Sequence, residues 1–193
     1  MGYSLSWAAL KKGSQQTACA VLGLRTTGKR EEIPESKIDG AALPTGWYVI
    51  QFNRTEMGDR ELARLSRSGE VVCCFVEDHV MVSWASGWRE GKKVWSVVHD
   101  CEKGRFHLDI KGEAPAALEG ITERLMAEQR AAGGEKAEVD HVYDVPAEIA
   151  KALTGYRHDE RSGLTGEVFE VLERESALGK LFGGFGRRNT SDV

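Results

Sequence analysis

The stretch from Glu70 to Gly112 constrains the fold more than any other part of the chain. It has the pattern of consecutive β-strands and carries three of the five tryptophans. Residues 71–76, Val-Val-Cys-Cys-Phe-Val, are apolar on both alternating faces, which is typical of a strand covered on both sides of a sheet. The stretch therefore predicts a central strand followed by further strands of the same sheet.

Two turns set the expected register of these strands. Residues 90–91, Glu-Gly, suit a two-residue reversal that places Trp84 opposite Val97. A four-residue loop at 101–104 then places Val97 opposite Leu108. Both turns continue one apolar face, which a slip of one residue would turn over. The predicted core of this face is Val80, Val82, Trp84, Trp95, Val97, Phe106, Leu108 and Ile110.

Weaker signals lie on both sides of this stretch. Apolar residues at helical spacing predict helices after Asp59, from Pro115 to Ala132 and from Pro146 to Leu153. Strands are predicted at 3–10, 18–24, 47–52 and 139–145, a weak last element near 169–172, and a long connection at 25–46. The expected fold class is α+β, with an antiparallel-dominated sheet of about five to seven strands and helices packed on it.

Composition narrows the class of protein. A net charge of −4 and 41% hydrophobic residues indicate a soluble globular chain, and the acidic balance disfavours nucleic acid as a partner. We expect one domain over residues 1–178 and a mobile, glycine-rich basic tail over 179–193. The N-terminus lacks a signal peptide, no run is long enough to span a membrane, and the four cysteines follow no disulfide framework, so we expect a cytoplasmic protein.

Motifs for nucleophilic or nucleotide-dependent chemistry are absent from the sequence, and no cofactor is expected. The densest titratable group contains His99, His107 and Asp109. His107 and Asp109 point the same way from one strand, and a bulge or shorter loop near Cys101 would add His99, giving a set able to hold a divalent metal. The favoured alternative is structural, with Asp100 pairing with Arg105 and both histidines serving as ordinary sheet residues.

Two segments are candidates for binding another protein. Trp88 and Arg89 lie in an expected loop at 86–90, and exposed Trp and Arg dominate binding hot spots. The alternative is that Trp88 caps the core. Phe182 and Phe185 in the tail are the second candidate, against an unstructured tail. The leading hypothesis is a non-enzymatic protein-interaction module of adaptor or inhibitor type. The alternative is a metal-assisted hydrolase using His107, Asp109 and His99, and a homo-oligomer is left open.

Overall fold

A single antiparallel sheet organises the molecule. The computed structural model describes residues 2–160 and 163–175. The nine strands are β1 (Ser4–Lys11), β2 (Leu24–Glu31), β3 (Ile38–Ala42), β4 (Trp47–Asn53), β5 (Val71–Glu77), β6 (Val82–Arg89), β7 (Lys92–Asp100), β8 (Asp109–Gly112) and β9 (Phe169–Arg174). The helices are α1 (Gln15–Leu22), α2 (Asp59–Leu65), α3 (Ala117–Ala131) and α4 (Val145–Thr154), with short 3-10 turns at Cys101–Lys103, Gly134–Lys136 and Val142–Asp144.

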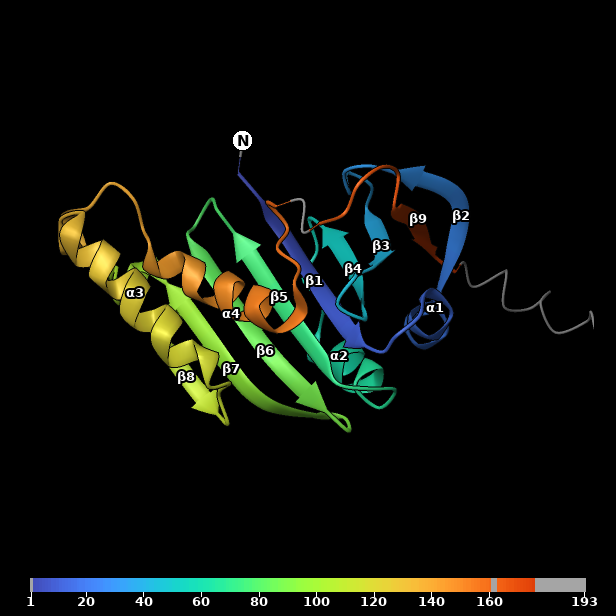
Figure 1. Cartoon of the computed structure of the whole chain (residues 1–193), viewed down its shortest axis with the longest axis horizontal. Coiled ribbons are helices and arrows are strands. Elements are labelled where there is room, and N and C mark those ends of the chain that lie inside the picture. Colours follow the sequence, from blue (N-terminus) through green and yellow to red (C-terminus); the bar gives the residue numbers. More distant parts are fainter. Residues whose placement is uncertain (1, 161–162, 176–193) are drawn as a thin grey trace, which may run out of the picture.

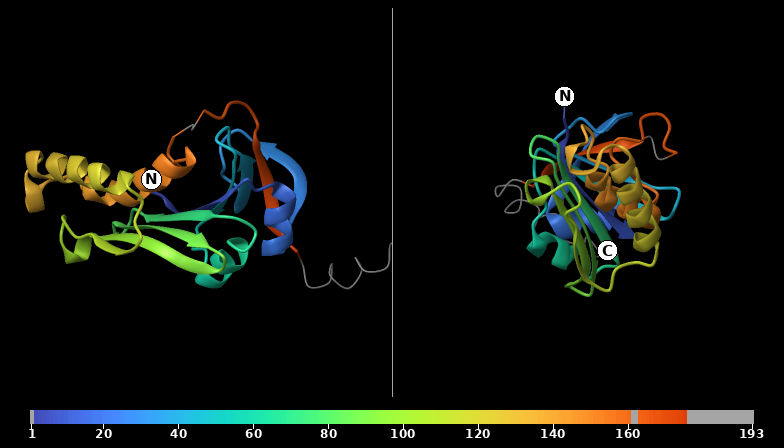
Figure 2. Two further views of the ribbon diagram at one scale, coloured as in Figure 1. Left: turned by 60° about the horizontal axis from the view of Figure 1, so that its bottom comes forward. Right: turned by 90° about the vertical axis from the view of Figure 1, so that its left-hand side faces the viewer.

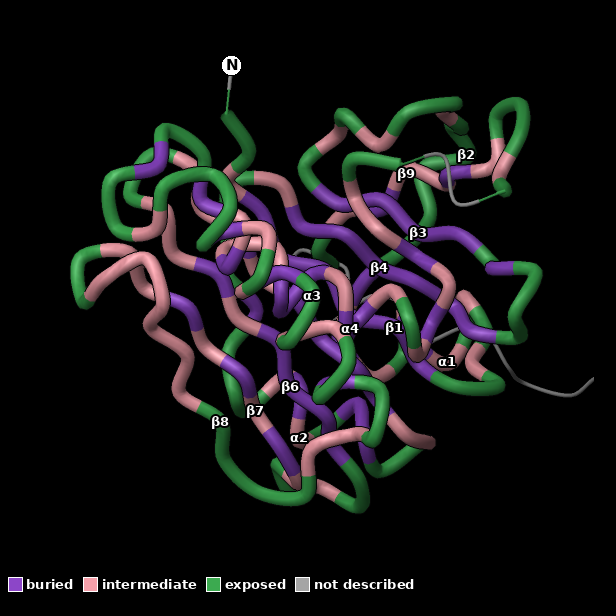
Figure 3. Tube along the Cα trace, turned by 60° about the vertical axis from the view of Figure 1, so that its left-hand side comes forward, coloured by how far each residue is buried: buried purple, intermediate pink, exposed green. Residues whose placement is uncertain are grey.

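The strand order is β2-β9-β3-β4-β1-β5-β6-β7-β8, and all paired neighbours run antiparallel (Figure 1). The predicted α+β class is therefore confirmed, although the sheet has more strands than the five to seven expected. The first strand of the chain lies at the centre of the sheet, and β2 and β8 form its two edges. The edge strands are mostly exposed, whereas the central strands are buried (Figure 3).

Helices cover the sheet on both faces. α3 and α4 lie over β5 to β8, and their apolar side chains join one buried cluster with Trp7, Trp95 and Val97 (Figure 2). α1 and α2 contribute to a second cluster on the opposite face, which contains Ile50 and Trp88. None of the helices in residues 2–160 and 163–175 is long and apolar enough to cross a membrane.

β5 is the central strand that the sequence predicts. It lies between β1 and β6, and Val71, Val72, Cys73 and Cys74 are all almost completely inaccessible to solvent. Burial raises the pKa of the Cys74 thiol to about 12. Both cysteines of this strand are free thiols that serve as small apolar side chains.

The predicted register of β6 and β7 is wrong by one residue. The turn itself is as expected, since Arg89 pairs with Lys92, but the register shifts beyond Trp88 and places Gly87 opposite Trp95. This bulge turns Trp84 to the opposite face from Trp95. Trp84 there stacks on Phe75, with ring centroids 5.7 Å apart.

The predicted core of this region needs the corresponding correction. Trp95 and Val97 are buried as expected, and Phe106 and Leu108 pack against the same cluster. Val82 and Trp84 are only partly buried. Val80 is 51% exposed because it lies in a turn, and Ile110 is 44% exposed because β8 has no neighbour on its outer side.

Three predictions of local structure are wrong. Residues 18–24 belong mainly to helix α1, which Ser14 caps through its side chain and Gly23 ends with a φ of 67°. The expected connection at 25–46 contains β2 and β3, and the expected strand at 139–145 is a 3-10 turn leading into α4. The helices after Asp59, from Pro115 and from Pro146 are confirmed as α2, α3 and α4.

Candidate functional site

A buried polar cluster joins β7 to the segment that precedes α4. His99 is completely buried, with its Nδ1 2.8 Å from the carbonyl oxygen of His107 and its Nε2 3.1 Å from Oδ2 of Asp140. Arg105 places Nη1 3.3 Å from the same carboxylate oxygen. The other carboxylate oxygen of Asp140 accepts the backbone N–H of Tyr143. Both oxygens of the Asp140 carboxylate thus lie close to a donor.

Both ring nitrogens of His99 face acceptors. Nδ1 lies against a backbone carbonyl oxygen, and Nε2 lies against the Asp140 carboxylate. Burial alone raises the pKa of Asp140, but the hydrogen bond and charge of His99, together with Arg105, hold it below its usual value. This buried cluster, which includes the Arg105–Asp140 ion pair, fixes the 3-10 turn at 142–144 against the sheet.

The three candidate metal ligands do not form one set. His99 and His107 do approach each other, with ring centroids 6.4 Å apart. Asp109 pairs with Val98 in the ladder and therefore lies on the opposite sheet face from His99. Its carboxylate is 2.6 Å from Nζ of Lys111, which lowers its pKa. Among residues 2–160 and 163–175, no three His, Cys, Asp or Glu side chains are grouped so as to hold a metal ion.

The sequence missed the true partners of these residues. Asp100 pairs with Lys103 instead of Arg105, and Arg105 reaches Asp140, which is far away in sequence. In the sequence, Asp140 belongs to a second titratable group with His141, Tyr143 and Asp144, whose pattern predicts part of an edge strand. No local pattern connects it with His99, because the contact exists only once α3 has folded back over the sheet.

The candidate partner-binding residues are divided between the interior and the surface. Residues 86–89 belong to strand β6 instead of a loop, and Trp88 is only 4% exposed. Its indole Nε1 donates to Oγ of Ser86, and its ring packs in the cluster beneath α1 and α2. Arg89 is exposed and pairs with Glu70 at 3.2 Å. Phe182 and Phe185 lie outside the residues that the structure describes, as does the whole segment 179–193.

A groove runs between edge strand β8 and helix α3. It has a volume of about 460 Å³. Its lining combines apolar side chains from both elements with two glutamates and a threonine of α3. The lining residues are Ile110, Ala114, Pro115, Ala116, Leu118, Glu119, Thr122 and Glu123. The buried hydroxyl of Thr122 has no hydrogen-bond partner.

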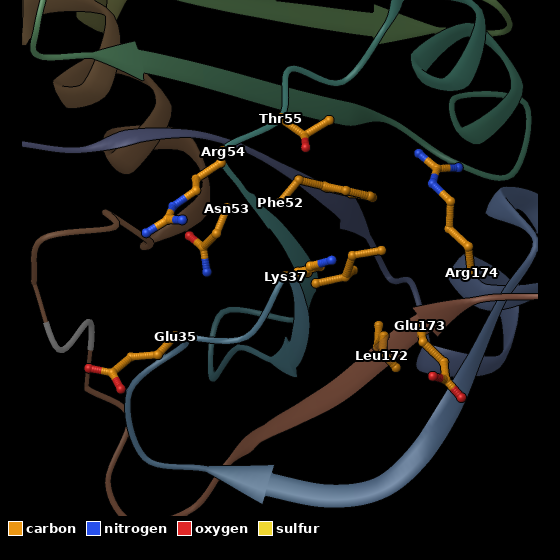
Figure 4. Close-up of a pocket in the computed structure, with 10 residues that line it drawn as sticks. Glu35, Lys37, Phe52, Asn53, Arg54, Thr55, Leu172, Glu173 and Arg174 are labelled. Carbon is orange, nitrogen blue, oxygen red and sulfur yellow. The ribbon is translucent and has the colours of Figure 1, made fainter.

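A larger pocket, of about 690 Å³, lies at the ends of β3, β4 and β9 (Figure 4). Its floor is apolar and contains Ile38, Phe52 and Leu172, all buried. Cationic and polar side chains surround this floor. They are Lys37, Asn53, Arg54, Thr55 and Arg174, together with Glu35 and Glu173.

Asp39 is a buried carboxylate whose pKa is strongly raised. It lies on β3, opposite Gln51, whose Oε1 accepts a hydrogen bond of 2.8 Å from the Tyr156 hydroxyl. Asp39 is completely buried, and neither of its carboxylate oxygens has a partner in hydrogen-bonding geometry. Burial raises the pKa of Asp39 to about 7, and the nearby Glu31 carboxylate adds to the rise.

This raised pKa predicts a pH-dependent stability. The folded state holds the Asp39 proton more tightly than the unfolded chain does. The contribution of Asp39 to the free energy of unfolding is therefore largest below about pH 4 and falls as the pH rises to about 7. Asp39→Asn mimics the protonated form. We expect it to remove this part of the pH dependence and, at about pH 8, to stabilise the fold by at most roughly 4 kcal/mol, at about 1.4 kcal/mol per pKa unit.

Chemical denaturation of both proteins across this pH range measures the difference. Asp59→Asn, at an exposed carboxylate, is the matched control and should leave the slope with pH unchanged. A D39N variant that is less stable than the wild type at pH 8 would show that the Asp39 carboxylate is not destabilising.

Comparisons with known proteins give no match to this chain, whether with family models, curated proteins or solved structures.

Proposed function

We propose that this protein is a non-enzymatic, cytoplasmic protein-interaction module that adds an extended segment of a partner protein to edge strand β8. The observation that supports this proposal is the open edge of β8 beside the groove formed with α3. Backbone hydrogen bonds would hold the segment, and alternate side chains would enter the groove, as in other modes of β-strand addition.

The backbone of β8 supports such pairing. Glu113 donates its N–H to the carbonyl of Val94, and the ladder continues through Lys111 opposite Ser96 and Ile110 opposite Val97. Because inward and outward residues alternate in an antiparallel ladder, the N–H and C=O of Ile110 point away from β7. β8 lies at one end of the sheet, and no other strand of residues 2–160 and 163–175 lies on its outer side (Figure 1). An added strand would meet these groups directly.

The groove indicates the chemistry of the partner. Ile110 and Leu118 offer apolar surface from the strand and the helix, so an apolar side chain of the partner would gain by burial there. Glu119 and Glu123 are exposed and form no ion pair with the described residues. A lysine or arginine of the partner would complement these two carboxylates. The expected partner segment is therefore extended, and every second side chain, the set that faces the groove, includes both apolar and basic residues.

Selection from a displayed library of random ten-residue peptides tests this proposal. We expect the selected peptides to carry apolar and basic residues at every second position and to bind at least tenfold more weakly after Ile110→Lys, which places a charge in the groove. Ile110→Pro should abolish binding as well, because proline removes the outward N–H while leaving the ladder to β7 intact. Ile33→Lys is the matched control, since Ile33 is also exposed but lies between β2 and β3, toward the opposite end of the sheet from β8.

Equal loss of binding in the Ile33 variant, or peptides without basic residues, would contradict the proposal. Sedimentation of the free protein provides a separate check. A dimer that Ile110→Pro dissociates would instead assign the β8 edge to a second copy of this chain.

A further inference from the structure

The pocket at the ends of β3, β4 and β9 has the features of a second binding site, independent of β8. We infer that it binds a small amphipathic anion, a molecule with an apolar body and a carboxylate or phosphate group. The pocket lies toward the opposite end of the sheet from β8 (Figure 1). Its volume of about 690 Å³ suits a metabolite-sized ligand.

The floor of the pocket accepts an apolar body. Ile38 and Phe52 are partners in the ladder between β3 and β4, and Leu172 stands beside them on β9. These side chains belong to the cluster that α1 and α2 cover elsewhere on the same face. Only the edges of these buried side chains line the pocket, and an apolar ligand would complete the packing of the cluster there.

The charges around the floor favour an anion. Glu173 is neutralised by Arg25, at 2.5 Å, and Arg174 is bound to Glu61 at 2.9 Å while its guanidinium lies 5.8 Å from the centre of the Phe52 ring. Lys37 and Arg54, by contrast, form no ion pair with the residues that the structure describes. The carboxylate of Glu35 points away from Lys37 (Figure 4). Lys37 and Arg54 are thus the cations of the pocket that can pair with an anionic ligand.

The backbone at Arg54 provides a second, independent observation. Arg54 has a φ of 58°, a left-handed conformation that disfavours any residue with a Cβ atom. Its N–H donates to the carbonyl of Ser4, which holds the turn after β4 in place. Glycine would suit this position better, yet the chain places a long cationic side chain there. Of the four non-glycine residues with this conformation among the described residues, Arg54 alone lines the pocket, which makes it the position to test for a binding role.

Calorimetric titration with four probes tests the inference, each kept below its micellar concentration. Octanoate and octyl phosphate carry an apolar body and an anionic group, octylammonium carries the opposite charge, and inorganic phosphate lacks the apolar body. We expect saturable binding of at least one octyl anion and little or none of octylammonium or inorganic phosphate. The tighter of the two octyl anions distinguishes a carboxylate ligand from a phosphate ligand.

Variants at Arg54 separate binding from folding. Arg54→Gly should weaken anion binding about fivefold, the factor that corresponds to about 1 kcal/mol for an exposed ion pair. Its melting temperature should equal or exceed that of the wild type, because glycine relieves the left-handed strain. Arg54→Lys keeps the charge and should bind within about twofold of the wild type. Lys37→Ala should weaken binding to the same degree as Arg54→Gly.

Lys12→Gly is the matched control. Lys12 is another exposed cation with a left-handed φ, of 52°, and it does not line this pocket. Its replacement should change stability in the same direction and leave anion binding unchanged. Equal weakening in the K12G and R54G variants, binding of octylammonium as tight as that of the octyl anions, or no saturable binding of either octyl anion would each overturn the inference.

Discussion

Asp140→Ala is expected to lower the free energy of unfolding by about 3–5 kcal/mol, the usual effect of removing one partner from a buried ion pair. The substitution leaves Nε2 of the completely buried His99 without its hydrogen-bond partner and Arg105 without its counter-charge. It also frees the N–H of Tyr143, which Asp140 accepts in the native protein. These groups would stay unpaired unless the turn at 142–144 opened to water. Denaturation with urea, monitored by tryptophan fluorescence, measures this loss.

Two further variants show that the pair itself is responsible. Asp109→Ala removes a carboxylate that is exposed and bound only to Lys111, and it should leave the unfolding midpoint within experimental error. His99→Leu combined with Asp140→Leu should be more stable than Asp140→Ala alone, because an apolar pair leaves no buried charge. An Asp140→Ala protein as stable as the Asp109→Ala protein would refute the assignment of this cluster as the anchor of the segment before α4.

Gly87→Ala is expected to destabilise the fold by about 3 kcal/mol, the upper range for overpacking a core. A Cβ atom at Gly87 would lie 2.0 Å from Nε1 and 2.4 Å from Cε2 of Trp95. The indole of Trp95 is buried beneath α3 and α4 and lies directly across Gly87, its partner in the ladder. Alanine suits a strand better than glycine by about 0.5–1 kcal/mol. The steric overlap with Trp95 costs more than this, so the net effect of the substitution is destabilising.

Gly120→Ala is the matched control for this prediction. Gly120 lies within α3, and a Cβ atom there would meet nothing within 4 Å. The same substitution should therefore stabilise the protein by about 1 kcal/mol through helix propensity. For a chain of this size, 1 kcal/mol shifts the melting temperature by about 2–4 °C, so the two variants should move it in opposite directions. A Gly87→Ala protein that melts at or above the wild-type temperature would show that Trp95 has room to move.

Local signals were sufficient for several elements. α3 was predictable because Pro115 lies just before it and its apolar residues recur at helical spacing, and α4 because Pro146 lies in its first turn and Gly155 caps its end. β5 was predictable because its run is apolar on both faces. The short apolar run of α1 fits either a strand or a helix, and the contacts of α1 with α2 and β2 settle it as a helix.

The edge strand β2 shows where the pattern of apolar residues fails to predict a strand. β2 is Leu-Arg-Thr-Thr-Gly-Lys-Arg-Glu, almost entirely exposed, so no alternation of apolar residues marks it. It forms a strand because β9, from the other end of the described chain, pairs with it. Backbone hydrogen bonds of this kind depend on distant partners and leave no trace in the local sequence.

By itself, the sequence determined the α+β class, the strand at 71–76 that is covered on both faces, and helices α3 and α4. Each of these depends on the spacing of apolar residues along a short segment. Only the tertiary structure decided the bulge at Gly87, the burial of Trp88, the pairing of His99 with Asp140, the groove between β8 and α3, and the pocket at the ends of β3, β4 and β9. Each of these depends on which distant side chains meet across the sheet, and a shift of one residue in register exchanges the buried and exposed faces of a strand.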